Sequence, residues 1–85
     1  MNIKFTPEAW QDYLFWQQHD KTVQKRINEL IRDITREPFQ GLGKPEPLRF
    51  ELSGFWSRRI NHEHRIVYRI KDGDVEIVSC RFHYQ

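Results

Sequence analysis

The sequence predicts an α+β domain, in which two N-terminal helices pack on one face of a mostly antiparallel, twisted sheet. Three observations carry this prediction. Apolar residues in the first half recur at helical spacing, whereas those in the second half alternate along short segments, as in strands that are covered on one face. The Asp72-Gly73 pair between two such segments is a hairpin signal. Because a chain of 85 residues has room for only one core, we expect a single domain over residues 1–85.

The first elements are predicted from turn chemistry and spacing. We expect a short strand at residues 2–5 and a helix at residues 7–18. Thr6 offers a side-chain oxygen that can cap this helix, and Pro7 stands at the first helical position, where a missing N–H costs nothing. Four residues inside the helix fall at helical spacing: Trp10, Tyr13, Leu14 and Gln17.

A second helix is expected between Asp20, which can cap its start, and Pro38, which ends it. One apolar stripe of about four turns runs along it and would face the core, through Val23, Ile27, Leu30, Ile31 and Ile34. Four charged residues lie off this stripe and are expected to be solvated: Lys25, Arg26, Arg32 and Asp33.

The second half is predicted to be a loop followed by strands. Residues 39–47 contain two glycines and two prolines, which indicates a loop. Four candidate strands follow, at residues 48–52, 55–60, 65–70 and 75–83. This order completes the α+β pattern, with the helices first and most of the sheet after them.

Strand alternation divides the side chains of these strands between two faces. Ile66, Tyr68 and Ile70 would face the helices, and so would Val78, Cys80 and Phe82 in the last strand. The opposite, open face would carry five groups that are positive or can become so: Arg59, Arg65, Arg69, Arg81 and His83. Arg58 breaks the pattern, because strict alternation places it among the apolar residues. We therefore expect a bulge or an edge position there.

The charge of the chain is small but concentrated. A formal net charge of +2 excludes a protein that coats nucleic acid through bulk charge. Residues 1–43 carry six basic and six acidic groups, whereas residues 44–69 carry six basic and three acidic groups. Two interpretations stay open. The arginines of this segment bind phosphate of RNA or DNA, or Glu46, Glu51 and Glu63 neutralise them in ordinary surface pairs.

Glu46 and His83 suggest what chemistry an open face of this kind would perform. A carboxylate and an imidazole can serve as proton acceptor and proton donor in one reaction. With arginines between them, the fitting reaction is RNA cleavage by the RNA's own 2′-hydroxyl, which needs no metal ion. The plainer alternative is a solvated loop glutamate and an incidental histidine near the chain end.

The remaining signals are mostly exclusions. One cysteine, Cys80, excludes an internal disulfide and a four-cysteine zinc site, and we expect it to be a small buried apolar residue. A zinc site from His62, His64, His83 and Cys80 is disfavoured, because Cys80 should face inward. The longest apolar run is too short for the roughly 18 residues that a membrane span needs, and we expect no membrane association.

Several motifs together resemble one known family, the YoeB-like toxins of the RelE superfamily. They are Lys-Pro-Glu-Pro-Leu at 44–48, Leu-Ser-Gly-Phe-Trp-Ser-Arg-Arg-Ile at 52–60, Glu-His-Arg-Ile-Val-Tyr at 63–68 and Cys-Arg-Phe-His-Tyr at 80–84. Residues 10–13 and 25–31 match as well, so the resemblance covers nearly the whole chain. It implies a RelE-like fold.

The resemblance also implies an activity, that of a ribosome-dependent mRNA endoribonuclease from a type II toxin–antitoxin pair. Such toxins enter the ribosomal A site, cut the mRNA codon there and stop translation. By matching position, Glu46 resembles the general base, His83 the general acid and Arg65 the group that stabilises the transition state. Four residues are expected to bind RNA: Lys44, Arg49, Arg59 and Tyr84. The chain departs from the family in having Arg49 where lysine is frequent, and Gln85 after the terminal aromatic residue.

The partners that the resemblance implies are a YefM-like antitoxin, the 70S ribosome with its mRNA, and a second copy of the chain. Operator DNA would be bound only through the antitoxin complex, and the location would be the bacterial cytoplasm. No cofactor is implied. An alternative is a non-catalytic ribosome- or RNA-binding inhibitor of translation, which would need the arginines but not Glu46 and His83. A DNA-binding role of its own is disfavoured, because no helix-turn-helix pattern is present.

Overall fold

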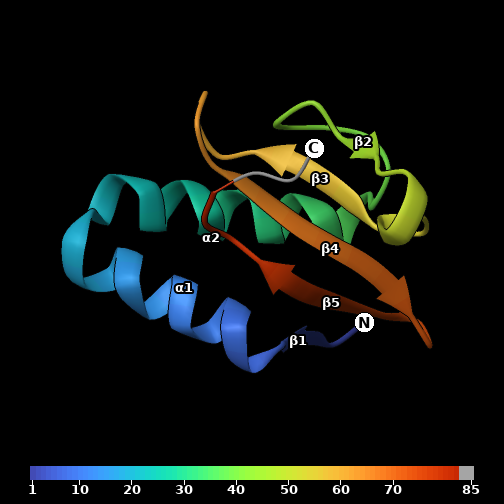
Figure 1. Ribbon diagram of the computed structural model, residues 1–85, viewed down its shortest axis with the longest axis horizontal. Coiled ribbons are helices and arrows are strands. Elements are labelled where there is room, and N and C mark those ends of the chain that lie inside the picture. The colour runs from blue at the N-terminus through green and yellow to red at the C-terminus, as the bar shows by residue number, and fades with distance from the viewer. Residues whose placement is uncertain (83–85) are drawn as a thin grey trace.

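In the computed structural model, two helices lie against one face of a five-stranded sheet (Figure 1). The structure describes residues 1–82. The elements are β1 (Ile3–Phe5), α1 (Pro7–His19), α2 (Lys21–Arg36), β2 (Glu46–Pro47), a 3₁₀ turn (Phe50–Leu52), β3 (Trp56–Arg59), β4 (Arg65–Lys71) and β5 (Asp74–Ser79). The strand order is β1-β5-β4-β3-β2. Only β1 and β5 pair in parallel among the described strands. The predicted α+β fold is thereby confirmed.

Both helices begin at the capping residues that the sequence indicates. The Thr6 hydroxyl accepts a hydrogen bond from the Ala9 amide (3.2 Å), and Pro7 is the first residue of α1. The Asp20 carboxylate accepts hydrogen bonds from the amides at the start of α2, at 3.1 and 3.2 Å. Each cap satisfies amides that have no partner within the helix, and is worth about 1 kcal/mol.

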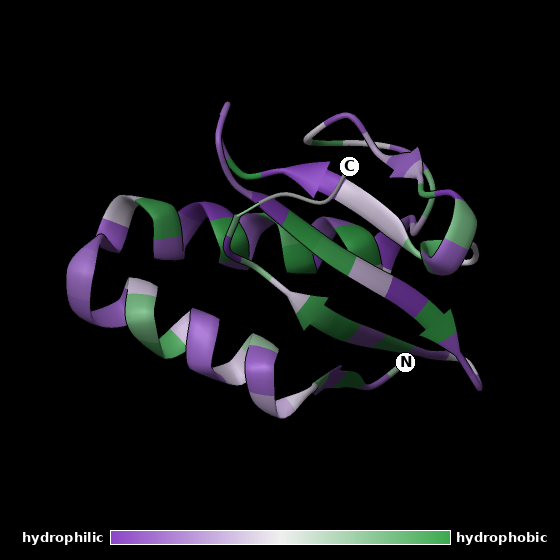
Figure 2. Ribbon diagram, in the orientation of Figure 1, coloured by the Kyte–Doolittle hydropathy of each residue, from purple (hydrophilic) through white to green (hydrophobic). Residues whose placement is uncertain are grey.

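The core lies between the helices and the sheet. The predicted stripe of α2 is buried, and Figure 2 shows it as alternating hydrophobic and hydrophilic bands along that helix. The sheet contributes Ile66 and Tyr68 from β4 and Val75 and Ile77 from β5, all fully buried. Burial of such a side chain stabilises the fold by about 1.5–3 kcal/mol. Within residues 1–82, no helix is both long and apolar enough to cross a membrane.

The predicted strand at residues 48–52 is wrong. The strand in this region is β2, only two residues long, and it ends at Pro47. Phe50 adopts a φ of +58°, which a strand excludes, and the Leu52 amide donates to the Arg49 carbonyl in the 3₁₀ turn (3.1 Å). A hydrogen bond from the Leu48 amide to the Phe55 carbonyl (2.8 Å) then closes the loop.

The last strand is also shorter than predicted, because β5 ends at Ser79 rather than at residue 83. β5 also contains a bulge at Val78, because Val67 pairs with Ser79 while Tyr68 pairs with Ile77. The extra residue shifts the alternation of side chains, so Val78 does not face the helices as predicted. Ile77 and Ser79 are buried, whereas Val78 is only half-buried. The prediction that Val78 and Phe82 face the helices is therefore wrong; Cys80 is buried as expected, but Phe82 is 58% exposed.

Candidate functional site

The open face of the sheet brings together Glu46, Arg59 and Arg65. Strand register places Glu46 opposite Ser57, and Arg59 opposite Arg65. Arg59 lies two residues after Ser57, so all of these side chains share one face of the sheet. The alternate residues of β3 and β4, such as Arg58 and Tyr68, are buried on the helix side. Three of the predicted site residues thus lie on three consecutive strands, on the face of the sheet opposite the helices.

Arg59 and Arg65 form a pair of cations that no carboxylate of residues 1–82 neutralises. Within the described part of the chain, neither has an acidic group within 4.0 Å. The Arg65 guanidinium instead donates from Nη1 to the carbonyls of Asn61 (2.8 Å) and His64 (3.1 Å), which hold it against the β3–β4 turn. Like charges directly opposite each other on a sheet are destabilising. A bound phosphate would relieve this repulsion, so the pair is suited to hold an anion.

This geometry bears on one of the two interpretations of the basic segment, the neutralisation of its arginines by surface carboxylates. Surface neutralisation by Glu46, Glu51 and Glu63 is wrong for Arg59 and Arg65. Of these three acids, only Glu63 lies within 4.0 Å of a basic side chain in residues 1–82, and that side chain is the imidazole of His64 (Nε2, 3.7 Å).

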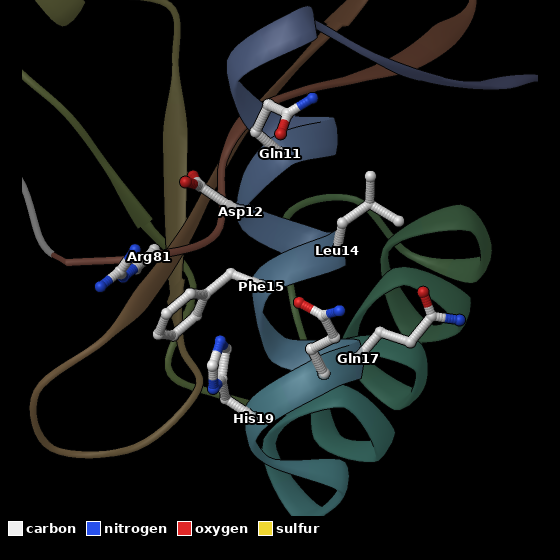
Figure 3. A pocket seen from close by; sticks show the side chains of 8 residues that line it. Gln11, Asp12, Leu14, Phe15, Gln17, His19 and Arg81 are labelled. Carbon is white, nitrogen blue, oxygen red and sulfur yellow. The ribbon is translucent and has the colours of Figure 1, made fainter.

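Two of the arginines predicted for the open face are engaged elsewhere. Arg69 lies on the open face as predicted, opposite Glu76 in the register of β4 and β5. Its Nε donates to the Glu76 carboxylate at 2.6 Å, which neutralises its charge. Arg81 turns toward α1, where its guanidinium carbon lies 3.6 Å from the centre of the Phe15 ring. Figure 3 shows the two side chains in the groove that runs along this helix. The prediction for the open face is therefore wrong for Arg81, whereas Arg69 lies on that face but is paired with Glu76. Among the described arginines of this face, Arg59 and Arg65 make no ion pair.

Lys44 and Arg49 flank Glu46 along the chain. Lys44 is exposed at the end of the loop that precedes β2, with a φ of +54°. Arg49 is exposed at the start of the 3₁₀ turn. Neither side chain makes an ion pair with another described residue. Both are available to a polyanion that reaches the Glu46 edge of the sheet.

His83 and Tyr84, which the sequence analysis assigned to the site, lie outside the described residues, as does Gln85. The chain that leads to them is fixed at the edge of the open face. The Phe82 amide donates to Nδ1 of His64 (2.7 Å), and the Phe82 carbonyl accepts from the Arg65 amide (2.8 Å). The last described residue, Phe82, is therefore bound to the backbone of Arg65, whose guanidinium belongs to the candidate site.

Helix α1 holds the same segment from the other side. The indole N–H of Trp16 donates to the Cys80 carbonyl (2.8 Å), and the Cys80 amide donates to the Asp12 carboxylate (3.1 Å). These bonds use backbone groups that would otherwise be buried without partners after β5 ends. They complete the fixation of the chain up to Phe82.

Cys80 is the small buried residue that the sequence analysis expects. Its side chain is fully buried, and burial together with the Asp12 carboxylate raises the pKa of the thiol to about 12. The thiol is therefore protonated at neutral pH and is not a nucleophile. Within residues 1–82, no three His, Cys, Asp or Glu side chains lie close enough to share a metal ion.

Sequence reasoning missed the most buried charged group, the guanidinium of Arg58. β3 is an interior strand and Arg58 follows strict alternation into the core with 0% exposure, so the predicted bulge or edge position is wrong. Its partner is Asp33, 2.6 Å away and only 7% exposed, although this residue was expected to be solvated. The sequence held a signal for this pair. Asp33 lies three residues after Leu30, on the same helix face as the apolar stripe, and its charge is opposite to that of Arg58, which alternation also places in the core.

A backbone hydrogen bond from Leu42, together with the guanidinium of Arg58, holds the pKa of Asp33 below its usual value. The carboxylate therefore stays ionised, and the buried guanidinium has a charged partner. A buried arginine without such a partner would carry a large desolvation cost.

Comparison with known proteins assigns the chain to a family. Residues 5–84 match the family model of the YoeB-like toxin of bacterial type II toxin–antitoxin systems. The chain is 64% identical to Toxin YoeB of Synechocystis over 85 residues, covering 100% of this chain and 99% of that protein. The solved YoeB/ParE toxin from Agrobacterium tumefaciens superposes with a TM-score of 0.97 at 50% identity, covering 99% of this chain and 100% of that chain.

A relative from Staphylococcus aureus has been solved in two assemblies. The YoeB dimer superposes with a TM-score of 0.92 at 50% identity, and the YoeB–YefM complex with a TM-score of 0.91 at 49% identity. Each match covers 99% of this chain and 98% of the solved one. Matches of this identity and coverage extend over the strands that carry Glu46, Arg59 and Arg65, and they show that the chain belongs to the YoeB-like toxins of bacterial type II toxin–antitoxin systems.

Proposed function

We propose that this toxin is a ribosome-dependent mRNA endoribonuclease that cuts the codon in the ribosomal A site. The observation that carries the proposal is the pair of Arg59 and Arg65 on the open face, without an acidic partner among residues 1–82. Arg59 lies on β3, next to the strand of Glu46, and Arg65 lies opposite Arg59 on β4. A paired, fixed guanidinium is suited to a phosphate whose charge increases in the transition state. A binding protein would need the cations but has no use for a carboxylate beside them.

The proposed reaction is metal-independent and uses the RNA's own 2′-hydroxyl. Glu46 accepts the proton of that hydroxyl, and its oxygen attacks the adjacent phosphorus. The new P–O bond gives a 2′,3′-cyclic phosphate as the bond from phosphorus to the 5′-oxygen of the next nucleotide breaks. His83 donates a proton to that leaving oxygen. Arg65 stabilises the additional negative charge on the phosphorane, with help from Arg59.

Four residues are proposed to hold the RNA: Lys44, Arg49, Arg59 and Tyr84. Lys44, Arg49 and Arg59 are exposed on or beside the open face. Lys44 would contribute a point charge, whereas the planar arginines can bind phosphate through two N–H groups. Tyr84 would stack on a base of the cleaved codon.

The modest charge supports dependence on the ribosome. A net charge of +2 gives little attraction to free RNA. An enzyme of this kind gains from a partner that aligns the mRNA, because orientation alone removes a large part of the barrier. We therefore infer that the 70S ribosome presents the codon to the site.

The partners of the relatives extend to this chain as part of the same proposal. The S. aureus relative forms a dimer and a complex with YefM. We infer that this toxin pairs with itself and with a YefM-like antitoxin, and that operator DNA is bound only through the antitoxin complex. Since its proposed substrate is ribosome-bound mRNA, the place of action would be the bacterial cytoplasm.

The test is primer extension on mRNA held in purified 70S ribosomes, with the wild-type chain, Glu46→Gln and His83→Gln. We expect the wild type to cut within the A-site codon, and both variants to bind ribosomes but to cut at least about 100-fold more slowly. Ribosome binding without any cut by the wild type would instead identify a non-catalytic inhibitor of translation.

A further inference from the structure

The guanidinium of Arg58 uses all of its N–H groups inside the protein. Nε donates to the Tyr68 hydroxyl (3.2 Å), and Nη1 donates to the Asp33 carboxylate (2.6 Å). The three other N–H groups donate to backbone carbonyls of one loop: Leu42 (3.2 Å), Glu37 (2.6 Å) and Gln40 (2.9 Å). The side chain of a central strand therefore holds the loop that leads from α2 to β2.

Asp33 and Tyr68 bind the same loop from either side of Arg58. The Asp33 carboxylate accepts from the Leu42 amide (2.9 Å), and the Tyr68 hydroxyl donates to the Pro38 carbonyl (2.6 Å). Gly41 passes so close that a Cβ there would lie 2.2 Å from an Asp33 oxygen, and its φ of +121° also favours glycine. The backbone of residues 37–42 thus follows the shape of the buried ion pair.

This loop ends four residues before Glu46, whose backbone is otherwise held by the short ladder with β3 and by the bond from the Leu48 amide to the Phe55 carbonyl (2.8 Å). β2 contains two residues, of which Pro47 has no N–H to donate to the ladder. Upstream of it, the Gly43 carbonyl accepts from the Arg59 amide at 2.6 Å. Arg58 and Arg59 therefore both hold the approach to Glu46, the first through its side chain and the second through its backbone.

A purely stabilising role would not require this arrangement. Buried ion pairs are weak contributors to stability, and apolar residues of similar volume often serve as well. An apolar residue at position 58 could not bind three loop carbonyls, and a lysine lacks the planar fork that reaches several acceptors at once. The distinctive property of Arg58 is thus its control of the loop conformation.

We propose that Arg58 with Asp33 is a positioning device, which fixes the loop at residues 37–42 and thereby the place of Glu46 relative to the phosphate at Arg59 and Arg65. The inference rests on the proposed endoribonuclease function. Arg58 touches no substrate; it acts through the loop, and through Glu46 on the chemical step.

The experiment measures kcat and KM for cleavage of A-site mRNA, well below the melting temperature of each variant. The first variant, Arg58→Lys, keeps the charge opposite Asp33 but loses most of the carbonyl contacts. The second, Tyr68→Phe, keeps the buried ring and removes only the hydroxyl, so it provides a test if Arg58→Lys does not fold. Val75→Ala is the matched control, because it truncates the core on β5, away from β2 in the sheet order.

We expect kcat to fall at least tenfold in Arg58→Lys and about threefold in Tyr68→Phe, with KM within twofold of the wild type. Val75→Ala should lower the melting temperature while both constants stay near those of the wild type. A kcat within twofold of the wild type for both loop variants would overturn the inference. Failure of the proposed function is distinguishable, because the wild-type chain itself would then not cut, or Glu46→Gln would cut equally well.

Discussion

Arg58 and Arg59 are neighbours on β3, yet they face opposite sides of the sheet. Arg58 is fully buried, paired with Asp33 and bound to the loop before β2. Arg59 is exposed, faces Arg65 and has no acidic partner among the described residues. The difference teaches that the same side chain type stabilises the fold on one face and, on the other, is exposed where we propose that phosphate binds. Alternation along the strand determines which role each arginine has.

The largest expected effect is a loss of folding stability when Arg58, the arginine that faces the helices, is replaced. Arg58→Met leaves the Asp33 carboxylate and several loop carbonyls buried without a partner, and should destabilise the protein by about 3–5 kcal/mol. Urea denaturation followed by circular dichroism measures the change. The matched control is Arg59→Met, which removes a like-charge contact and should change stability by less than about 1 kcal/mol. Equal losses in both variants would remove the contrast between the two faces.

The outward arginine should matter for the substrate instead. Loss of hydrogen bonds to a charged group costs about 1.5–3 kcal/mol each, so Arg59→Met should lower kcat/KM about 10- to 100-fold. Cleavage of A-site mRNA in 70S ribosomes, at several concentrations of toxin, measures this effect. Cleavage by Arg59→Met at the wild-type rate would mean that Arg59 does not contact the RNA.

The pH dependence of stability should follow the inward pair. The pKa of Asp33 is lower in the folded protein than its usual value of 3.8, chiefly through the Leu42 amide, with further help from Arg58. Its contribution is therefore fully present above that usual value, and is lost as the pH falls through the lowered folded pKa. In denaturation curves between pH 6 and pH 2, we expect the wild type to lose stability more steeply than Asp33→Asn. Parallel curves would contradict this assignment.

The smallest effect concerns the other buried group on the helix side. Because burial raises the pKa of the Cys80 thiol to about 12, iodoacetamide at pH 7.5 should leave the folded chain unmodified over an hour. The same reagent should alkylate the chain fully in urea. Mass spectrometry distinguishes the two results. Rapid alkylation of the folded chain would contradict the prediction, because it would show that the Cys80 thiol becomes accessible to solvent.

Local chemistry made most of the fold predictable. Thr6 and Asp20 cap their helices through contacts within three residues, and the stripe on α2 is read directly from spacing. The predicted strand at residues 48–52 failed because the positive φ at Phe50 and the 3₁₀ turn go with closure of the loop and are not indicated by residue type. Such tertiary effects override propensity.

The candidate site was predictable only in part. Glu46, Arg59 and Arg65 were found from the motif and from alternation, and the register places them on one face. The Asp33–Arg58 pair was missed, because its members are 25 residues apart and each alone reads as a surface charge. Only their packing against the same loop makes their burial favourable.

The most direct test of the account is the single-turnover rate of Arg65→Met on mRNA in 70S ribosomes, measured with its melting temperature. The account predicts cleavage about 100- to 1,000-fold slower than in the wild type, because one fixed donor to the developing charge is lost. The melting temperature should not fall in proportion, since Arg65 has no carboxylate partner among residues 1–82. A wild-type rate in the folded variant would contradict the claim that the open face holds the reacting phosphate.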